Sequence, residues 1–206
     1  MADELIDIYD SEMNLLGVAM KSQAHDEGLW HKVFHCWIVS EDGNVWLLQH
    51  GGADKNLDTG LLDISCAGHL QVGETAKAGG LRELEDKFGL HLKEHNLVKM
   101  YTQKIIFDEP YHNREFCPTY LYRTQTKLFD LKLQPEETDG IYQADIQELA
   151  DLFFDDVKKI TVSGIKRTAK GYKENKRTVT KTDFCPHGDR FYQKAFTTLL
   201  RFIDNQ

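Results

Sequence analysis

Two carboxylates and a lysine in one short stretch of the chain are spaced for phosphate chemistry. Glu83, Asp86 and Lys87 lie three and four residues apart, and residues at these spacings project from one face of a helix. Carboxylates gathered on one face offer the oxygen ligands that Mg2+ prefers, and the ion also binds water and substrate phosphates. Such an ion would neutralise a diphosphate and activate a water for attack on phosphorus. The plain alternative is an exposed ion pair between Glu83 and Lys87, which stabilises a helix by about 0.2–0.5 kcal/mol.

The neighbouring sequence predicts the elements that position these side chains. A glycine-rich loop begins at Gly68, and a mostly apolar stripe then repeats every three or four residues, which predicts a helix over 75–88. Gly89 is a natural stop for that helix. Gly79 and Gly80 lie inside it and each costs about 1 kcal/mol relative to alanine, which indicates tight packing against a neighbour.

The stretch 68–90 resembles the Nudix box. In that pattern a glycine is followed after five residues by a glutamate, and after seven more by Arg-Glu-aliphatic-x-Glu-Glu-x-Gly-aliphatic. The matching residues are Gly68, Glu74, Arg82, Glu83, Leu84, Gly89 and Leu90. Asp86 is a shortened match, and Lys87 replaces the last glutamate. The resemblance implies that Glu83 and Asp86 hold Mg2+, with Mn2+ as a second candidate ion, and that Glu74 and Arg82 orient the site.

Lys87 places a positive charge where the family has a metal ligand. Two unit charges about 4 Å apart interact by roughly 4 kcal/mol at an effective dielectric near 20. The substitution therefore predicts a site with fewer or weaker metals than the family norm. The lysine stem could instead turn its ammonium away from the metal, or toward a substrate phosphate.

A second resemblance, over roughly residues 4–150, is to the isopentenyl-diphosphate isomerase branch of Nudix proteins. It rests on the segments 31–37, 47–49, 63–69 and 113–118. The resemblance implies that His31, His69 and Glu115 correspond to metal ligands of the isomerase, and that Glu115 also corresponds to its catalytic glutamate. His25 lies near another ligand position but is offset by one residue.

Two other isomerase positions are changed in this chain. The catalytic cysteine position is Ala67, with Cys66 one place early, and a shift of one residue in a strand turns a side chain to the opposite face. Asn113 stands where the isomerase has a second carboxylate ligand. These changes argue against isomerase activity, and Cys66 is expected to be a small buried hydrophobe.

Each retained residue also has a structural explanation. A single histidine such as His31 or His69 is often a hydrogen-bonded structural residue, and Glu115 beside Arg114 could form a surface ion pair. The functional alternative for Glu115 is a third carboxylate that reaches the metal, or a general base. Gly68 and His69 would line the phosphate pocket, Arg114 could contact phosphate oxygens, and His31 is a further candidate for substrate binding.

Composition and charge limit the possible classes of protein. The net charge is −8, so nonspecific nucleic-acid binding is not expected. The four cysteines form no Cys-x-x-Cys pair, which favours reduced thiols. The stretch 183–189 holds Cys185 and His187, but two ligands do not complete a tetrahedral zinc site, so no metal is expected there.

The N-terminus lacks the features of a signal peptide, and no apolar run approaches the roughly 20 residues that span a bilayer. We expect a cytoplasmic protein with no membrane partner.

The remaining pattern predicts strands mixed with a few helices. Strand-turn-strand is expected over 4–20, a hairpin over 31–48, and a short buried strand over 61–67. Further strands are expected at 98–107, 115–124 and 141–144, with amphipathic helices at 145–154 and 191–203. The segment 158–181 holds nine Lys or Arg against one Glu. This composition favours a solvated loop or hairpin, with a surface that helps hold a polyanionic substrate as the alternative.

Together these patterns predict an α/β chain, residues 1–206, forming a single Nudix domain. Its box is 68–90, and the basic segment 158–181 and the C-terminal helix 191–203 extend it. The resemblance implies an α/β/α sandwich with a mixed central β-sheet and is compatible with a homodimer. It also implies Mg2+-dependent hydrolysis of a small-molecule diphosphate, a nucleoside diphosphate derivative being the leading candidate, with Glu83 and Glu115 as catalytic residues. The alternatives are a noncatalytic binding module and an isopentenyl-diphosphate isomerase.

Overall fold

The computed structural model describes residues 3–51, 59–107, 112–134 and 138–204 of the chain. The chain forms two compact units that interleave in sequence. Unit 1 comprises 1–36, 66–86 and 91–121, and unit 2 comprises 37–65, 87–90 and 122–206. Because the chain passes repeatedly from one unit to the other, no single cut separates them into consecutive domains. The single domain over 1–206 stays a prediction.

Unit 1 begins with the predicted strand-turn-strand. β1 (Leu5–Tyr9) and β2 (Leu15–Met20) pair antiparallel. The Asp10 side chain closes the turn by accepting hydrogen bonds from the backbone N–H groups of Glu12, at 2.9 Å, and Asn14, at 2.8 Å. A short helix, α1 (Lys21–Asp26), follows β2 and has no counterpart in the sequence predictions.

The centre of unit 1 is built around β3. This strand (Trp30–Ser40) forms the predicted hairpin with β4 (Asn44–His50). In unit 1 it pairs antiparallel with β6 (Cys66–His69), and Phe34 lies opposite Gly68. The strand β8 (Asn113–Thr124) pairs with β3 and with β7 (Val98–Phe107). A 3-10 turn, η1 (Glu94–Asn96), precedes β7.

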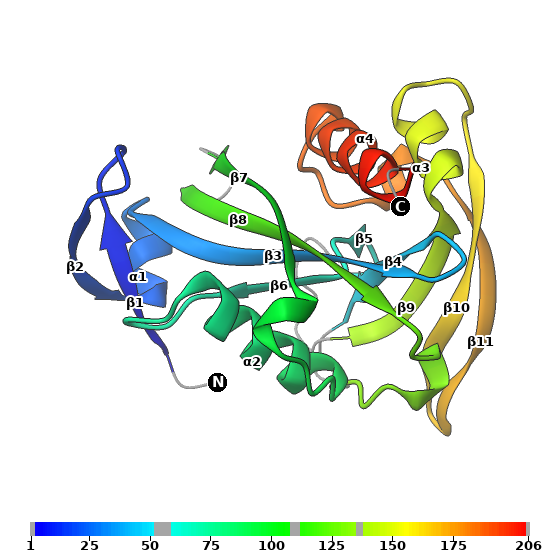
Figure 1. Cartoon of the computed structure of the whole chain (residues 1–206), viewed down its shortest axis with the longest axis horizontal. Helices are drawn as coiled ribbons and strands as arrows, with labels where there is room; N and C mark the ends of the chain where they lie inside the picture. The colour runs from blue at the N-terminus through cyan, green and yellow to red at the C-terminus, as the bar shows by residue number, and fades with distance from the viewer. Residues whose placement is uncertain (1–2, 52–58, 108–111, 135–137, 205–206) are drawn as a thin grey trace. The chain divides into compact units, whose positions relative to one another are not determined.

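The predicted helix is α2 (Ala76–Phe88), which runs beside β6 (Figure 1). Its two internal glycines make the expected close contacts. A Cβ on Gly80 would lie 2.2 Å from the Phe34 ring, and one on Gly79 would lie 2.5 Å from Leu70. The helix ends at Phe88, and Gly89 has a φ of +69°, which favours glycine at a helix stop. These contacts confirm the tight packing predicted for the helix.

Unit 2 carries an antiparallel ladder of four strands. β4 pairs with β9 (Thr138–Asp145), which pairs with β10 (Ile160–Thr168), which pairs with β11 (Gly171–Val179). The predicted basic segment is therefore a hairpin. The short strand β5 (Leu62–Asp63) pairs with β4, and the 3-10 turns are η2 (Leu128–Asp130) and η3 (Lys181–Asp183).

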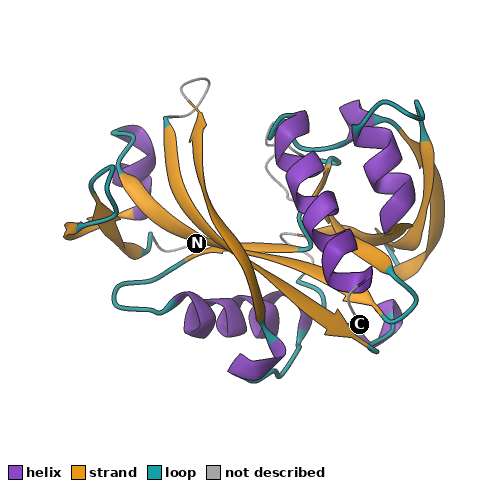
Figure 2. Cartoon of the chain, turned by 45° about the horizontal axis from the view of Figure 1, so that its top comes forward, coloured by secondary structure: helices purple, strands orange, loops and turns teal. Residues whose placement is uncertain are grey.

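Two helices pack together in unit 2. α3 (Ile146–Phe153) and α4 (Asp189–Asp204) lie side by side (Figure 2). Asp145 caps α3 by accepting hydrogen bonds from the N–H groups of Gln147 and Glu148, which satisfies donors that a helix start leaves open. Phe153 stacks on Tyr192 with ring centroids 4.3 Å apart, so aromatic rings join the two helices.

The strand ladders with the registers given above are antiparallel, and an isolated bridge between Leu62 and Phe184 is parallel. The described chain thus has an α/β architecture with a mixed, mostly antiparallel sheet. None of the helices in the described ranges combines the length and the apolar character that crossing a bilayer requires.

Candidate functional site

The Glu83 carboxylate lies directly on the backbone of Gly68. A Cβ built on Gly68 would stand 2.0 Å from Glu83 Cδ and 2.2 Å from its Oε2, far closer than two unbonded atoms approach. Only a glycine leaves room for the carboxylate at this point of β6. The Glu83 side chain is 13% exposed, so the acid is held at a defined place beside the glycine-rich loop.

Arg82 joins the two glutamates of the box. Its Nε and Nη2 donate to the two carboxylate oxygens of Glu74 at 2.8 and 2.9 Å, and its Nη1 donates to Glu83 at 2.8 Å. Nη2 also donates to the backbone carbonyl of His69 at 3.1 Å. The hydrogen bonds from Arg82 lower the pKa of Glu74 below its usual value. This geometry agrees with the orienting role of Glu74 and Arg82, which stays a prediction.

Asp86 lies less closely held than Glu83. Its carboxylate is 3.9 Å from Arg82 Nη1, and its side chain is 56% exposed. Lys87 occupies the last turn of α2. Among the described residues, the groups of three or more clustered metal-ligating side chains include neither Glu83 nor Asp86. Their assignment as Mg2+ ligands stays a prediction.

Three imidazoles meet beside the loop. His25 from α1, His31 from β3 and His69 from β6 bring one ring nitrogen each within 4.8 Å of the others. His25 Nε2 and His69 Nε2 are 3.0 Å apart, and the rings of His31 and His69 stack with centroids 5.2 Å apart. Neutral imidazoles in such a cluster are the donors that first-row transition metals and zinc prefer.

The burial and hydrogen bonding of the His31 ring indicate whether these three histidines fit a metal ion. Its side chain is fully buried, and its Nδ1 bonds the backbone carbonyl of Leu29 at 2.8 Å. Its Nε2 has no hydrogen-bond partner within the described part of the chain and lies 3.9 Å from Glu115 Oε1. A buried ring nitrogen of this kind is costly without a partner. Burial lowers the pKa of His31 to about 4, which leaves the ring neutral and able to ligate near pH 7, so the site fits a metal ion.

Glu115 is buried on the same side as His31. Its Oε1 accepts a hydrogen bond from Asn113 Nδ2 at 2.6 Å, and its Oε2 accepts one from Cys117 Sγ at 3.5 Å. His35 completes a buried group with Glu115 and Cys117. Burial, and then the nearby Glu115 carboxylate, raise the pKa of the Cys117 thiol well above its usual value. The surface ion pair with Arg114 is therefore a poor account of Glu115.

Arg114 lies on the opposite face of β8 from Glu115. Successive side chains of a strand point to opposite faces, and Arg114 is exposed where Glu115 is buried. Its Nε would be 3.7 Å from a Cβ on Gly28. Its predicted contact with phosphate stays a prediction that the local geometry does not support.

The register of β6 places the two isomerase-like positions on opposite faces. Cys66 lies opposite Cys36, and Ala67 lies opposite His35. Cys66 is fully buried, which confirms that it is a small buried residue. The face of β6 that carries His69 thus has a methyl group, not a thiol, at the position before Gly68.

His25 is the residue that sequence reasoning missed as a member of this group. Its offset of one residue from the isomerase pattern argued against it. A shift of one residue turns a side chain by about 100° in a helix, so only the placement of α1 in the structure shows that His25 reaches His31 and His69. A histidine just before the strand that carries His31 was the available signal.

The burial of His31 predicts a loss of stability in acid. Its pKa is about 4 in the folded protein against an ordinary 6.5, so the unfolded state binds more protons between these values and stability falls as the pH drops through this window. Between pH 7 and pH 5 this lowers the unfolding free energy by about 2 kcal/mol. Urea unfolding in chelator at both pH values measures the change. His31→Gln should remove this fall in the unfolding free energy between pH 7 and pH 5, whereas His95→Gln, a change at an exposed position, should leave it in place. An equal pH dependence of stability in the wild type and in both variants would contradict the prediction.

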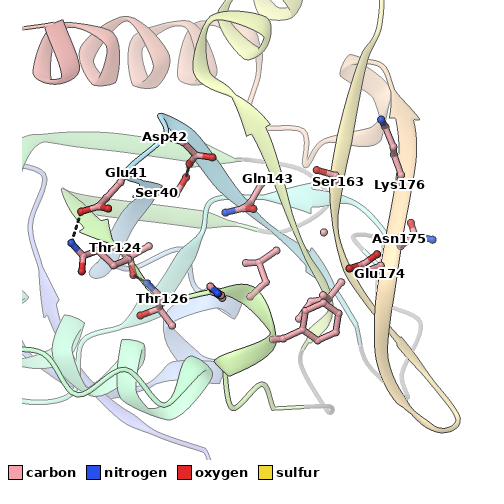
Figure 3. Close-up of a pocket in the computed structure, with 16 residues that line it drawn as sticks. Ser40, Glu41, Asp42, Thr124, Thr126, Gln143, Ser163, Glu174, Asn175 and Lys176 are labelled. Carbon is pink, nitrogen blue, oxygen red and sulfur yellow. Dashed lines mark hydrogen bonds between the residues drawn. The ribbon is translucent and has the colours of Figure 1, made fainter.

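A separate cavity lies in unit 2. It has a volume of about 760 Å³ and is lined by the β3–β4 turn, residues 124–129 and the sheet strands (Figure 3). Glu41, Asp42 and Glu174 bring three carboxylates to its wall, against the ammonium groups of Lys127 and Lys176. None of the predicted site residues lines it. The excess of carboxylates gives no support to the alternative that the basic hairpin holds a polyanion in this cavity.

Comparison with known proteins gives the class of protein that this fold and site define. The sequence model of the NUDIX domain matches residues 29–163, so the chain belongs to the Nudix family. It is 30% identical over 209 residues to an uncharacterized Nudix hydrolase of Clostridium acetobutylicum, with 97% of this chain and 98% of that protein covered. It is 32% identical over 162 residues to the isopentenyl-diphosphate Delta-isomerase of Serratia proteamaculans, with 78% of this chain and 87% of that protein covered.

The similar solved structures have low sequence identity to this chain, so they are informative about its fold alone. A MutT/nudix family protein from Enterococcus faecalis superposes with a TM-score of 0.54 at 11% identity, over 83% of this chain and 62% of that one. The predicted Nudix fold, with a mixed and mostly antiparallel central sheet, is confirmed. The similarity to both Nudix hydrolases and isopentenyl-diphosphate isomerases, predicted from the sequence, is also confirmed.

Proposed function

We propose that this chain hydrolyses a diphosphate linkage in a small molecule, in a reaction that depends on a divalent metal ion. The observation that carries the proposal is the Glu83 carboxylate, pressed against Gly68 and held by Arg82. A carboxylate fixed in this way costs little reorganisation when it binds an ion or takes a proton. The substrate class that the family resemblance favours is a nucleoside diphosphate derivative.

The roles follow from this arrangement. Glu83 and Asp86 provide oxygens for Mg2+ or Mn2+, and Glu115 supplies a further carboxylate or acts as the general base. Glu74 and Arg82 orient the acidic face of α2, and the loop at Gly68 and His69 receives the phosphates.

The imidazole cluster adds a second kind of ligand. His25, His31 and His69 would hold a metal of the zinc or iron kind better than magnesium, since imidazole nitrogens suit those ions. The ion supplies charge neutralisation at the diphosphate. The chain itself contributes the neutral, oriented His31 ring and the buried Glu115 next to it.

A second candidate function is isomerisation of an allylic diphosphate. The convergence of three histidines near Glu115 favours it. Ala67 argues against it because a methyl group cannot exchange a proton with substrate. Hydrolysis needs no group at that position, so it agrees better with the residues present.

A substrate panel tests the proposal. Nucleoside diphosphate-linked compounds and isopentenyl diphosphate are incubated with Mg2+ or Mn2+, and phosphate is measured after coupling to a phosphatase, with isomer formation followed separately. We expect phosphate from at least one nucleoside diphosphate derivative and no isomer. Isomer formation without hydrolysis would overturn the proposal.

Lys87→Glu should tighten metal binding, so that less metal is needed for activity. Replacing the ammonium by a carboxylate adds an oxygen ligand and removes a like charge, so we expect half-maximal activity at a metal concentration lower by roughly tenfold. Metal titrations of the hydrolysis rate measure this. Lys99→Glu makes the same charge change at an exposed position and should leave the titration midpoint unchanged. No product from any substrate, in either wild type or Lys87→Glu, would favour a noncatalytic binding module.

A further inference from the structure

Four side chains with metal-binding atoms meet in unit 2, away from the residues of the Nudix box. They come from the end of β4, from β5 and from the segment between η3 and α4. The members are His50, Asp63, Cys185 and His187. His50 Nε2 lies 2.9 Å from Asp63 Oδ2, and His187 Nε2 lies 2.8 Å from Asp63 Oδ1. The donor atoms of His50, Asp63 and Cys185 all lie within 4.8 Å of one another.

The backbone around Cys185 is fixed by several contacts. Its N–H donates to the Leu62 carbonyl at 2.8 Å, and its own carbonyl accepts from the Tyr192 hydroxyl at 2.9 Å. The neighbouring Phe184 forms the parallel bridge with Leu62. Cys185 is therefore held against β5, next to the carboxylate of Asp63.

The two imidazoles are also positioned by their surroundings. The His187 ring stacks on Phe191 with centroids 4.4 Å apart, and its side chain is 17% exposed. The His50 side chain is 36% exposed, so the group is open to solvent on one side. An ion can enter there without unfolding of the unit.

We propose that His50, Asp63 and Cys185 form a second metal site that takes one zinc-class ion and fastens the segment before α4 to β4 and β5, while His187 holds the other oxygen of Asp63. One nitrogen, one oxygen and one sulfur leave the fourth position of a tetrahedral zinc ion to water. Ligands about 2.0–2.3 Å from a tetrahedral ion stand roughly 3.3–3.8 Å apart. The 2.9 Å between His50 Nε2 and Asp63 Oδ2 is shorter than that spacing, and the three donor atoms lie within 4.8 Å of one another, so side-chain movements would be needed to admit the ion.

The competing account is a carboxylate clamped between two histidines by hydrogen bonds alone. A clamp of that kind keeps the Cys185 thiol protonated. Coordination converts Cys185 to a thiolate bound to the ion, with loss of the thiol proton and of any proton on the coordinating His50 nitrogen. The thiol therefore distinguishes the two accounts.

Cobalt binding to the full chain tests the proposal. The protein is stripped with a chelator and titrated with Co2+, and the near-ultraviolet charge-transfer band that reports a cobalt–thiolate bond is recorded. We expect the band in wild type, its loss in Cys185→Ser, and its retention in Cys117→Ser. The last variant is the matched control because Cys117 lies in the group with His35 and Glu115. The histidine cluster at His25 contains no thiol and cannot produce the band.

Two results would overturn the proposal: no thiolate band in wild type, or a band lost in Cys117→Ser and kept in Cys185→Ser. His50→Gln provides a second variant in case Cys185→Ser does not fold. Its half-exposed position should tolerate the change, and we expect Co2+ to bind at least about tenfold more weakly while the band remains at saturation. Zinc should raise the thermal midpoint of stripped wild type more than that of His50→Gln; an equal shift in both would count against the site.

Discussion

Replacing Glu83 by glutamine should lower turnover of the diphosphate substrate by about 10²–10⁴-fold. Glutamine has nearly the same shape and can still accept the hydrogen bond from Arg82, so the fold and the position of the side chain should persist. It lacks the negative charge that binds a cation and the basicity that takes up a proton. The expected loss is therefore in kcat, with little change in the urea midpoint.

Steady-state kinetics at saturating metal measure this effect on the best substrate from the panel. Glu85→Gln is the matched control because Glu85 lies on the same helix, is 56% exposed, and pairs with His91 at 3.0 Å. It should keep nearly full activity. Equal losses in both variants would mean that the general charge of α2, and not the carboxylate at Gly68, supports the reaction.

Gly68→Ala should reproduce most of this loss without touching an ionisable group. The added Cβ would stand 2.0 Å from Glu83 Cδ, so the carboxylate must move by more than about 1 Å, and a displacement of that size can cost about 100-fold in rate. The atoms that must move are the far end of a flexible side chain, and Gly68 is not among the residues with positive φ. Stability should therefore change little.

A double-mutant cycle separates displacement of the carboxylate from other effects. If Gly68→Ala acts through Glu83, the double variant with Glu83→Gln should be no slower than Glu83→Gln alone, because the two changes remove the same interaction. Independent, multiplying losses would show that the alanine acts on the phosphate pocket instead. Chemical unfolding of each variant shows whether the fold is intact.

Local sequence was enough to predict most of the elements. The stripe over 75–88 and the stop at Gly89 follow from helical periodicity and from the freedom of glycine at positive φ. The hairpins follow from alternating apolar residues on either side of polar turns. The strand expected over 61–67 is instead two short strands. Ser65 lies between them, and its hydroxyl bonds the Trp46 carbonyl and the Ile38 N–H, so β5 pairs with β4 while β6 pairs with β3.

The helix α1 shows why the candidate site was only partly predictable. Six residues carry too few turns for a periodic signal, and their helical state is what brings His25 to His31 and His69. The Nudix box by contrast has its residues in one continuous stretch. Its pattern could therefore be read directly, including the departure at Lys87.

The sequence by itself determined the family, the box helix and the carboxylates that the helix carries, because these depend on spacing along a single element. Only the tertiary structure decided which side chains from distant segments share a point in space. It set Glu83 on Gly68 and brought His50 and Asp63 to Cys185 and His187. The physical reason is that strand register and close packing at glycine determine which of these side chains come into contact. Both depend on interactions between residues far apart in the chain.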